Sequence, residues 1–268
     1  MIETALESSL TMVLEKPCAR GSSLASCLVK DKSCDQLYYA KSNIGASLEH
    51  SYREALKEKI ALSLYSYFGM AVPDSRIALL PIHYSYDSYS NELFGFEQSR
   101  KTSYYLCTQY IEAEPLSKNS LLDDSQAAEV LAVGYLLNDV DVFGGSFKNV
   151  LYAVNQSGHK QLYKIDAGEC FYSKEGSEAF AHVRYATQGS DIYIDVNRLP
   201  NHMKNAFYDT LGRVLNLKSE DIVSHLFSGL ETSDLTVNRT MIADIISFLF
   251  QRMSRLKQHY SNYTRDPS

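Results

Sequence analysis

The strongest constraint on the fold is a run in the middle of the chain where polar side chains bracket two strand-like segments. These segments are residues 150–154 and 161–165, and a polar turn, residues 155–159, joins them. Asn149 stands directly before the first segment, and Asp166 stands directly after the second. Because antiparallel strands joined by a tight turn place their open ends side by side, we expect Asn149 and Asp166 at the same edge of one hairpin.

The residues around this hairpin have the composition of a magnesium-nucleotide site. Asp139 and Asp141 precede it, separated from it by a Gly-Gly turn, and Gly168 follows Asp166 by two residues. Carboxylate and amide oxygens are the hard ligands that Mg²⁺ prefers, so the pattern predicts an acid that orients an attacking group and two ligands for the ion. The alternative is that these residues only form turns, since Asp, Asn and Gly are typical of loops.

Composition limits the classes of function. The chain has 268 residues, enough for one large domain or two lobes around a cleft, and its formal net charge of −6 argues against non-specific nucleic-acid binding. Five cysteines form no CxxC pair and seven histidines form no HxxxH pair, so we expect reduced thiols and no zinc site. No Sec-type signal and no transmembrane segment are expected, which favours a cytoplasmic location.

The order of the elements predicts an α+β, two-lobed fold. Strand-like segments crowd the first half, at residues 23–30, 37–42, 76–84 and 103–111, with a polar loop at residues 86–102. Helical periodicity is found at residues 48–68, 125–138, 201–215, 219–230 and 237–260. We therefore expect an N-lobe of residues 1–112, with a small antiparallel sheet and one helix. A mostly helical C-lobe of residues 113–268 would carry the hairpin.

A cation is also available to meet phosphates. Lys41 ends the second strand-like segment, and the following helix offers Glu54 and Glu58, one turn apart. A buried lysine needs an acidic partner, because a buried charge without one is expensive. The alternative is an edge lysine that points to water, with glutamates that are ordinary solvated helix residues.

On these segments the chain resembles the atypical kinases of the clan that includes phosphatidylinositol 3- and 4-kinases, actin-fragmin kinase and HipA-like toxin kinases. It is also similar in style to kinase-like effectors that intracellular bacteria inject into host cells. The matching segments are YYAKSN (38–43), EKIALSLYSYFGMAVPDSRIAL (58–79), TQYIEAEPL (108–116), NDVDVFGGSFKNVLY (138–152) and KIDAGECF (164–171). The resemblance covers residues 16–171 and implies a kinase-like fold with ATP and Mg²⁺ as cofactors.

The resemblance implies a role for each matching residue. Lys41 would contact the nucleotide phosphates and Glu58, rather than Glu54, would pair with it. The hinge that meets adenine would be Gln109, Tyr110 and Ile111, and Ser22 and Ser23 offer a weak phosphate loop whose alternative is an ordinary turn. Asp141 would be the catalytic acid with Asp139 as its rival, and Asn149 and Asp166 would bind Mg²⁺.

The chain departs from the clan's pattern in four respects, the first of which is that no GxGxxG precedes Lys41. Asp141 and Asn149 are eight residues apart, whereas about five is usual in kinases. The His or Arg expected beside the catalytic acid is absent. Tyr39 lies two residues before Lys41, on the same face of its strand, where a small residue usually leaves room for adenine.

The resemblance implies an ATP- and Mg-dependent phosphotransferase. Its acceptor would be a protein Ser/Thr, a small alcohol or a phosphoinositide, and no nucleic acid is expected as a partner. As an effector, it would enter a host cell without a Sec-type signal and act on a host protein. The alternatives are a pseudokinase-like module that binds nucleotide or an inositol phosphate and engages a protein partner, and the same fold with another ATP-driven transfer such as AMPylation or amino-acid ligation.

Overall fold

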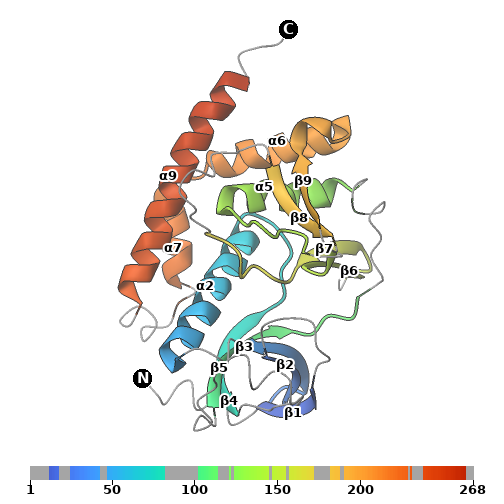
Figure 1. The fold of residues 1–268 in the computed structure, drawn as a ribbon, viewed down its shortest axis with the longest axis vertical. Coiled ribbons are helices and arrows are strands. Elements are labelled where there is room, and N and C mark those ends of the chain that lie inside the picture. The colour runs from blue at the N-terminus through green and yellow to red at the C-terminus, as the bar shows by residue number, and fades with distance from the viewer. Residues whose placement is uncertain are drawn as a thin grey trace. The chain divides into compact units, whose positions relative to one another are not determined.

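The chain folds as an α+β protein with a small antiparallel sheet and several helices (Figure 1). The computed structural model describes residues 12–17, 25–42, 47–81, 102–113, 121, 124–144, 147–154, 157–171, 182–187, 190–228, 230 and 238–263. It divides into two compact units: the first holds residues 1–59 and 73–111, and the second holds residues 60–72 and 112–268. The sequence predicts a single division after residue 112, whereas the structure also assigns residues 60–72 to the second unit.

The predicted helices and strands agree with the described ones to within a few residues at each end. In chain order the elements are β1 (Met12–Pro17), β2 (Ala25–Asp31), β3 (Gln36–Ser42), α2 (Leu48–Tyr67), β4 (Ser75–Pro81), β5 (Thr102–Gln109), α5 (Ser125–Leu137), β6 (Val150–Val154), β7 (Lys160–Lys164), β8 (His182–Thr187), β9 (Ser190–Asp195), the 3-10 helix η2 (Val196–Arg198), α6 (Asn201–Leu215), α7 (Ser219–Ser228) and α9 (Arg239–Tyr263). The sequence indicates a strand-like run at His182 and Arg184, which lie in β8, but the prediction does not include β1 or β9. Most of the predicted polar loop, residues 86–101, lies outside the described residues.

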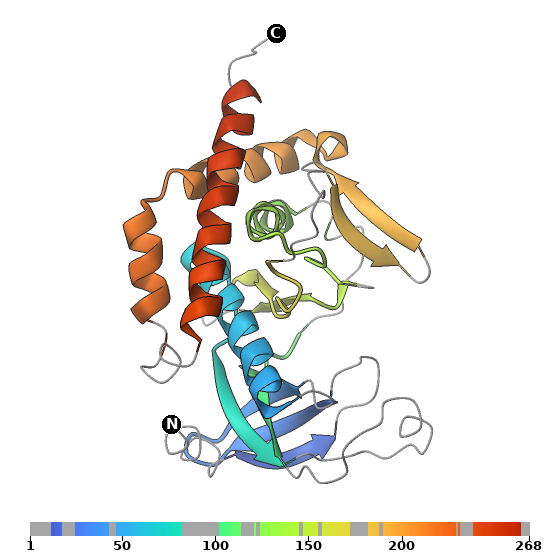
Figure 2. The ribbon, with the colours of Figure 1, turned by 60° about the vertical axis from the view of Figure 1, so that its left-hand side comes forward.

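The first unit contains a twisted five-stranded antiparallel sheet with strand order β1-β2-β3-β5-β4 (Figure 2). Alternate residues of its strands form a small apolar core on one face, which includes Val29, Ala40 and Tyr105. Because side chains alternate along a strand, Lys41 projects to the other face, the one that carries Tyr104 and Leu106. Helix α2 packs on that face, where its Tyr52 meets Tyr104 edge-on with ring centroids 4.9 Å apart.

Helix α2 belongs to both units. Its apolar residues recur at helical spacing, and Leu56, Ile60 and Leu64 are buried. Gly69 ends the helical segment in the left-handed conformation, with φ of 94°, and its N–H donates to the carbonyl of Ser66. Residues 48–59 of α2 belong to the first unit, and residues 60–67 belong to the second.

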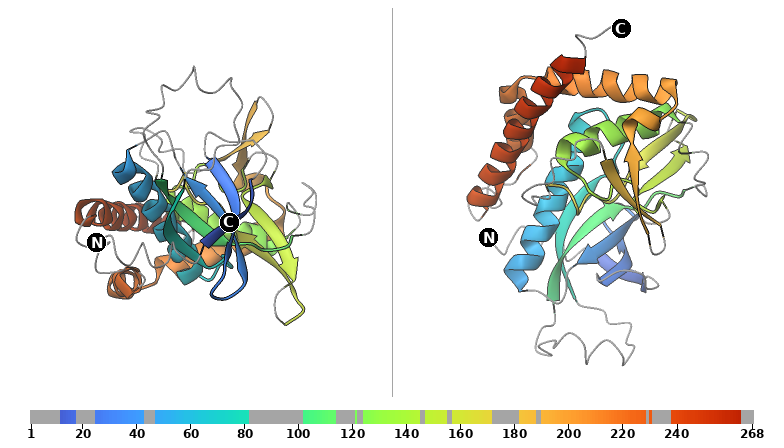
Figure 3. Two further views of the ribbon diagram at one scale, coloured as in Figure 1. Left: turned by 90° about the horizontal axis from the view of Figure 1, so that it is seen from below. Right: turned by 45° about the horizontal axis from the view of Figure 1, so that its top comes forward.

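The second unit is built around helix α5, which is buried along most of its length and packs against α6 and α9 (Figures 2 and 3). Asp124 begins α5, since its side chain accepts the N–H of Gln126, and Asn138 ends it with φ of 50°. Arg252 of α9 donates from Nε and Nη2 to the carbonyl of Tyr135, in the last turn of α5. A cation at a helix C-terminus is favourable, so this contact fixes α9 against α5. In the described ranges no helix combines the length and apolar character needed to cross a membrane.

Candidate active site

The loop that follows α5 carries the two candidate catalytic acids. The N–H of Asp139 donates to the carbonyl of Gly134 at 2.9 Å, so the loop folds back directly onto the end of α5. Gly134 permits this approach, because a Cβ at this position would clash with the side chain of Val142 and lie 2.8 Å from the hydroxyl oxygen of Tyr65. The position of Asp141 is therefore tied to a buried helix.

Asp141 and Asn149 lie in contact despite their eight-residue separation. The amide nitrogen Nδ2 of Asn149 donates to the carbonyl oxygen of Asp141 at 2.7 Å and to its Oδ2 at 3.1 Å. Two residues in left-handed conformation, Gly144 (φ 70°) and Phe147 (φ 60°), let the longer loop close. A Cβ on Gly144 would lie 2.5 Å from Cγ of Asn149, so only glycine leaves room for this amide. Asp141 and Asn149 are thus paired although their separation in the chain is longer than is usual in kinases.

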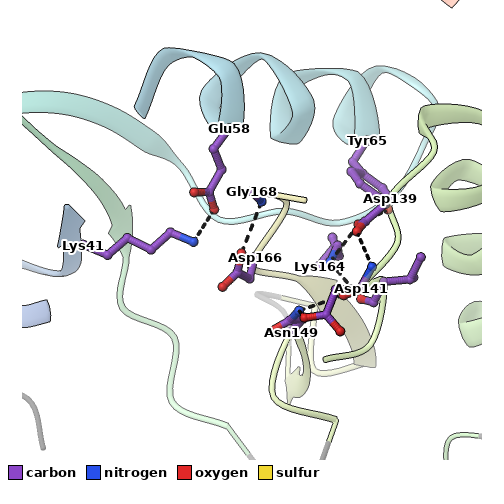
Figure 4. A network of polar contacts seen from close by, with 10 residues as sticks. Lys41, Glu58, Tyr65, Asp139, Asp141, Asn149, Lys164, Asp166 and Gly168 are labelled. Carbon is purple, nitrogen blue, oxygen red and sulfur yellow. Dashed lines mark hydrogen bonds and ion pairs between the residues drawn. The ribbon is translucent and has the colours of Figure 1, made fainter. Parts of the chain in front are cut away.

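The hairpin brings Asn149 and Asp166 to one edge, as the sequence predicts. In the register of β6 and β7, Val150 lies opposite Lys164, and the N–H of Ile165 donates to the carbonyl of Asn149 at 3.1 Å. Asp166 follows directly, and its Oδ1 accepts the N–H of Gly168 at 3.3 Å (Figure 4). That bond orients the Asp166 carboxylate within a tight turn.

The electrostatic environment makes Asp141 more basic than an ordinary aspartate. Burial raises the pKa of Asp141, and the negative charges of Asp139 and Asp166 raise it further. The hydrogen bond from Asn149 and the charge of Lys164 act in the opposite direction without cancelling the rise. A carboxylate with a raised pKa is a better acceptor for the proton of an attacking hydroxyl.

Asp139 has different surroundings from Asp141. Its side chain is 1% exposed, and Lys164 Nζ lies 3.1 Å from its Oδ2. The hydroxyl of Tyr65 donates to the same oxygen at 2.8 Å (Figure 4). Burial and the charge of Asp139 raise the pKa of Tyr65 well above its ordinary value, so the phenol remains a donor. The carboxylate of Asp139 is thus enclosed by protein donors.

Lys41 pairs with Glu58 within the first unit (Figure 4). The Nζ of Lys41 lies 2.6 Å from Oε1 of Glu58, and the two side chains are 10% and 7% exposed. Glu54, the other candidate, is exposed. The alternative interpretation of Lys41 as an edge lysine that points to water is therefore wrong.

The residues that the resemblance assigns to adenine and to a phosphate loop are less well placed to bind a nucleotide than Lys41. The N–H groups of Gln109 and Tyr110 donate to the carbonyls of Asp74 at 2.7 Å and Leu37 at 2.8 Å. Two of the three N–H groups of the predicted hinge are therefore used within the protein. Tyr39 is 37% exposed on the lysine's side of β3. Ser22 and Ser23 lie outside the described residues.

The side-chain oxygens of Asn149 and Asp166 are of the kind that binds a magnesium ion. The Nδ2 group of Asn149 donates to Asp141, so the Oδ1 of Asn149 is the atom that could bind a cation. Asp166 has a carboxylate at the same edge of the hairpin. Mg²⁺ is commonly held by one or two protein oxygens, with water and phosphate completing its shell. In the described part of the chain no group of three or more His, Cys, Asp or Glu side chains could hold a metal by itself.

The sequence prediction does not include Lys164 and Tyr65 of this site, and it includes Gly144 only as part of a Gly-Gly turn. Lys164 carries a signal that could have been found, because it has the same parity along its strand as the buried Leu162. A lysine on the buried side of a strand indicates a buried ion pair. Tyr65 carries no comparable signal, since its partner, Asp139, is set by the fold.

Neither a protein-family model nor a curated protein sequence matches this chain.

Proposed function

We propose that the chain is an ATP- and Mg-dependent phosphotransferase with a two-lobed, atypical kinase fold. The observation that carries this proposal is the arrangement of Asp141, Asn149 and Asp166 around one hairpin. Asp141 is basic and held by Asn149, while Asn149 and Asp166 share an edge. An acid, an amide and a second acid in these positions match the parts that phosphoryl transfer requires.

The reaction would be an in-line transfer of the γ-phosphoryl group. Asp141 would orient the acceptor hydroxyl and accept its proton as the new P–O bond forms and the bond between the γ-phosphorus and the bridging oxygen breaks. Lys41, held by Glu58, would donate to the phosphate oxygens. A magnesium ion on Asn149 and Asp166 would supply positive charge that neutralises the phosphates. The acceptor would be a protein Ser/Thr, a small alcohol or a phosphoinositide.

A thermal-shift titration of the full chain with ATP, with and without Mg²⁺, tests the proposal. A ligand that binds only the folded state stabilises it by about 2.7 kcal/mol at one hundred times Kd, so the midpoint should rise. We expect this rise to require Mg²⁺ and to disappear in Asp166→Asn. The matched control is Asp35→Asn, because Asp35 is 84% exposed in a turn of the first unit.

Release of phosphate from ATP, with water as the acceptor, then tests for transfer. Release that requires Mg²⁺ and falls in Asp141→Asn would support a kinase. No shift for the wild type at millimolar ATP would contradict it. Transfer of AMP instead of phosphate to a target, seen by its mass, would indicate the same fold with AMPylation chemistry.

A non-catalytic, pseudokinase-like binding module is the second candidate. The observation that favours it is that two of the three predicted hinge N–H groups, those of Gln109 and Tyr110, already donate to protein carbonyls. Such a module would engage a protein partner and could hold an inositol phosphate in place of a nucleotide. Stabilisation by ATP without phosphate release, or stabilisation by an inositol phosphate alone, would favour this candidate.

A further inference from the structure

The buried cluster of Lys164, Asp139 and Tyr65 stands beside the candidate acid but offers nothing to solvent. Lys164 is 0% exposed and the side chain of Asp139 1% exposed, and Tyr65 is fully buried. These residues come from β7, from the loop after α5 and from α2, all within the second unit. None of them can reach a substrate in this arrangement, so any effect on chemistry must pass through a neighbour.

The cluster contacts the backbone on both sides of the Asp141 side chain. Oδ1 of Asp139 accepts the N–H of Asp141 at 3.0 Å. Nζ of Lys164 donates to the carbonyl of Val142, the next residue, at 2.8 Å. The N–H of Asp141 and the carbonyl of Val142 are thus both hydrogen-bonded to the cluster. These two bonds restrain the backbone that carries the Asp141 side chain.

The same lysine connects the loop to the strand that leads to Asp166. Lys164 is the last residue of β7, and Asp166 follows it by two residues. The N–H of Lys164 donates to the carbonyl of Ala71 at 2.9 Å, which fixes this end of the strand. A shift of Lys164 would therefore move the Asp141 loop and the Asp166 turn relative to each other.

Stability alone is a weak explanation for this cluster. Replacing a buried ion pair with apolar residues of similar volume is often neutral or stabilising, because the desolvation cost offsets the attraction. Compared with apolar side chains, such a pair fixes the geometry of its neighbours better, because each hydrogen bond sets the angle and distance of its partner. Misplacing a catalytic group by about 1 Å can cost about 10²-fold in rate.

We propose that Lys164, Asp139 and Tyr65 are positioning residues that hold Asp141 in register with Asp166. The expected effect on catalysis rests on the proposed function. The positioning of Asp141 itself can be measured without nucleotide. It also assigns Asp139 to positioning rather than to proton transfer.

Two variants test the cluster, and one control matches them. Tyr65→Phe removes the hydroxyl that donates to Asp139, and Asp139→Asn combined with Lys164→Met neutralises the pair while keeping an oxygen for the N–H of Asp141. The control is Tyr152→Phe, because the Tyr152 hydroxyl also donates to a carboxylate, that of Asp124, in the same unit. The control removes the same chemical group at a distance from the cluster.

Two readouts are needed on the full-length chain. The first is amide hydrogen exchange at Asp141, followed by NMR without nucleotide, and we expect about tenfold faster exchange in both cluster variants. The second is kcat and KM for phosphate release from ATP with Mg²⁺. We expect kcat to fall about 10-fold in Tyr65→Phe and about 10²-fold in the double variant, with KM unchanged. The control should change neither readout.

The outcomes separate this inference from the proposed function. Unchanged exchange at Asp141 and unchanged kcat in both cluster variants would overturn the inference, whatever their stability. If the wild type neither binds nor hydrolyses ATP, the proposed function fails, and exchange alone decides: faster exchange supports the positioning, and unchanged exchange overturns it. A loss of stability equal to that of Tyr152→Phe, with no local change, would show a merely structural role.

Discussion

At the scale of single residues, Gly144 decides whether the candidate site can form. Its φ of 70° is strained for any residue with a side chain, and a Cβ would lie 2.6 Å from Oδ1 of Asn149. Two penalties therefore apply at this position, one from the backbone and one from the contact. Gly158, in the hairpin turn, shares the first penalty only, because its φ is 79° and a Cβ there would meet nothing within 4 Å.

We predict that Gly144→Ala and Gly158→Ala differ in nucleotide binding more than in stability. Each should lose about 1–2 kcal/mol of unfolding free energy from the left-handed backbone, and Gly144→Ala should lose more because of the contact with Asn149, as measured by urea denaturation. Only Gly144→Ala should also displace Asn149 and weaken the Mg-dependent stabilisation by ATP. Equal nucleotide responses in the two variants would show that the contact with Asn149 does not matter for binding.

At the scale of elements, a buried ion pair connects the β2–β3 turn to β4. Asp31 is 1% exposed, receives hydrogen bonds from N–H and Oγ of Ser33, and pairs with Arg76 of β4. Burial alone raises the pKa of Asp31, but the hydrogen bonds from Ser33 and Arg76 and the charge of Arg76 outweigh it. The net result holds the pKa of Asp31 well below its ordinary value of 3.8.

This pair predicts a loss of stability in acid. Because the pKa of Asp31 is lower in the folded state, the unfolded state binds more protons at acidic pH, and stability rises with pH in that window. The contribution is fully present above about pH 5 and is lost as the pH falls below about 4. Urea unfolding of the wild type and Asp31→Asn should differ by about 2 kcal/mol at pH 7, and the difference should shrink steadily below about pH 4 and disappear only below the lowered pKa of Asp31.

Asp35→Asn is the control for this prediction. Asp35 lies in the same turn and pairs with Lys30 at 2.6 Å, but it is 84% exposed, so its ion pair is screened by water. We expect its substitution to change stability much less at every pH. A difference between the wild type and Asp31→Asn that stays constant down to pH 3 would contradict the assignment of the acid-sensitive group.

At the scale of the whole molecule, the proposed function requires groups from both units to act on one nucleotide. Lys41 and Glu58 belong to the first unit, and Asp141, Asn149 and Asp166 belong to the second. The chain connects the units through α2, which contributes to each. Nucleotide binding is therefore a property that neither unit is expected to show alone.

We predict that Lys41→Met and Asp166→Asn each abolish Mg-dependent binding of ATP, although they alter different units. Removing the cation beside buried Glu58 should also destabilise the fold by about 3 kcal/mol. Binding should therefore be measured by calorimetry below the unfolding transition. Lys30→Met, in the same sheet and 32% exposed, should bind ATP normally. Binding that survives in Lys41→Met would show that the first unit does not supply the phosphate contact.

Much of the fold follows from local patterns in the sequence. The apolar periodicity of α2, the glycine that ends it and the sheet strands β2, β3 and β5 are all visible there, because each depends on residues close in the chain. Strand β1 is missed because the segment MVLEKP has neither clear alternation nor β-rich composition, and only its pairing with β2 makes it a strand.

The sequence by itself determines that Asn149 and Asp166 share an edge, because a short hairpin fixes the positions of its own ends. Only the tertiary structure distinguishes the surroundings of Asp139 from those of Asp141, since the groups that enclose Asp139 come from Lys164 and from Tyr65, which is 74 residues away. It also decides that Asp141 and Asn149 stay paired across their eight-residue separation, because the left-handed backbone at Phe147 is not indicated by its residue type. Contacts between remote segments depend on packing of the whole unit, which no local pattern records.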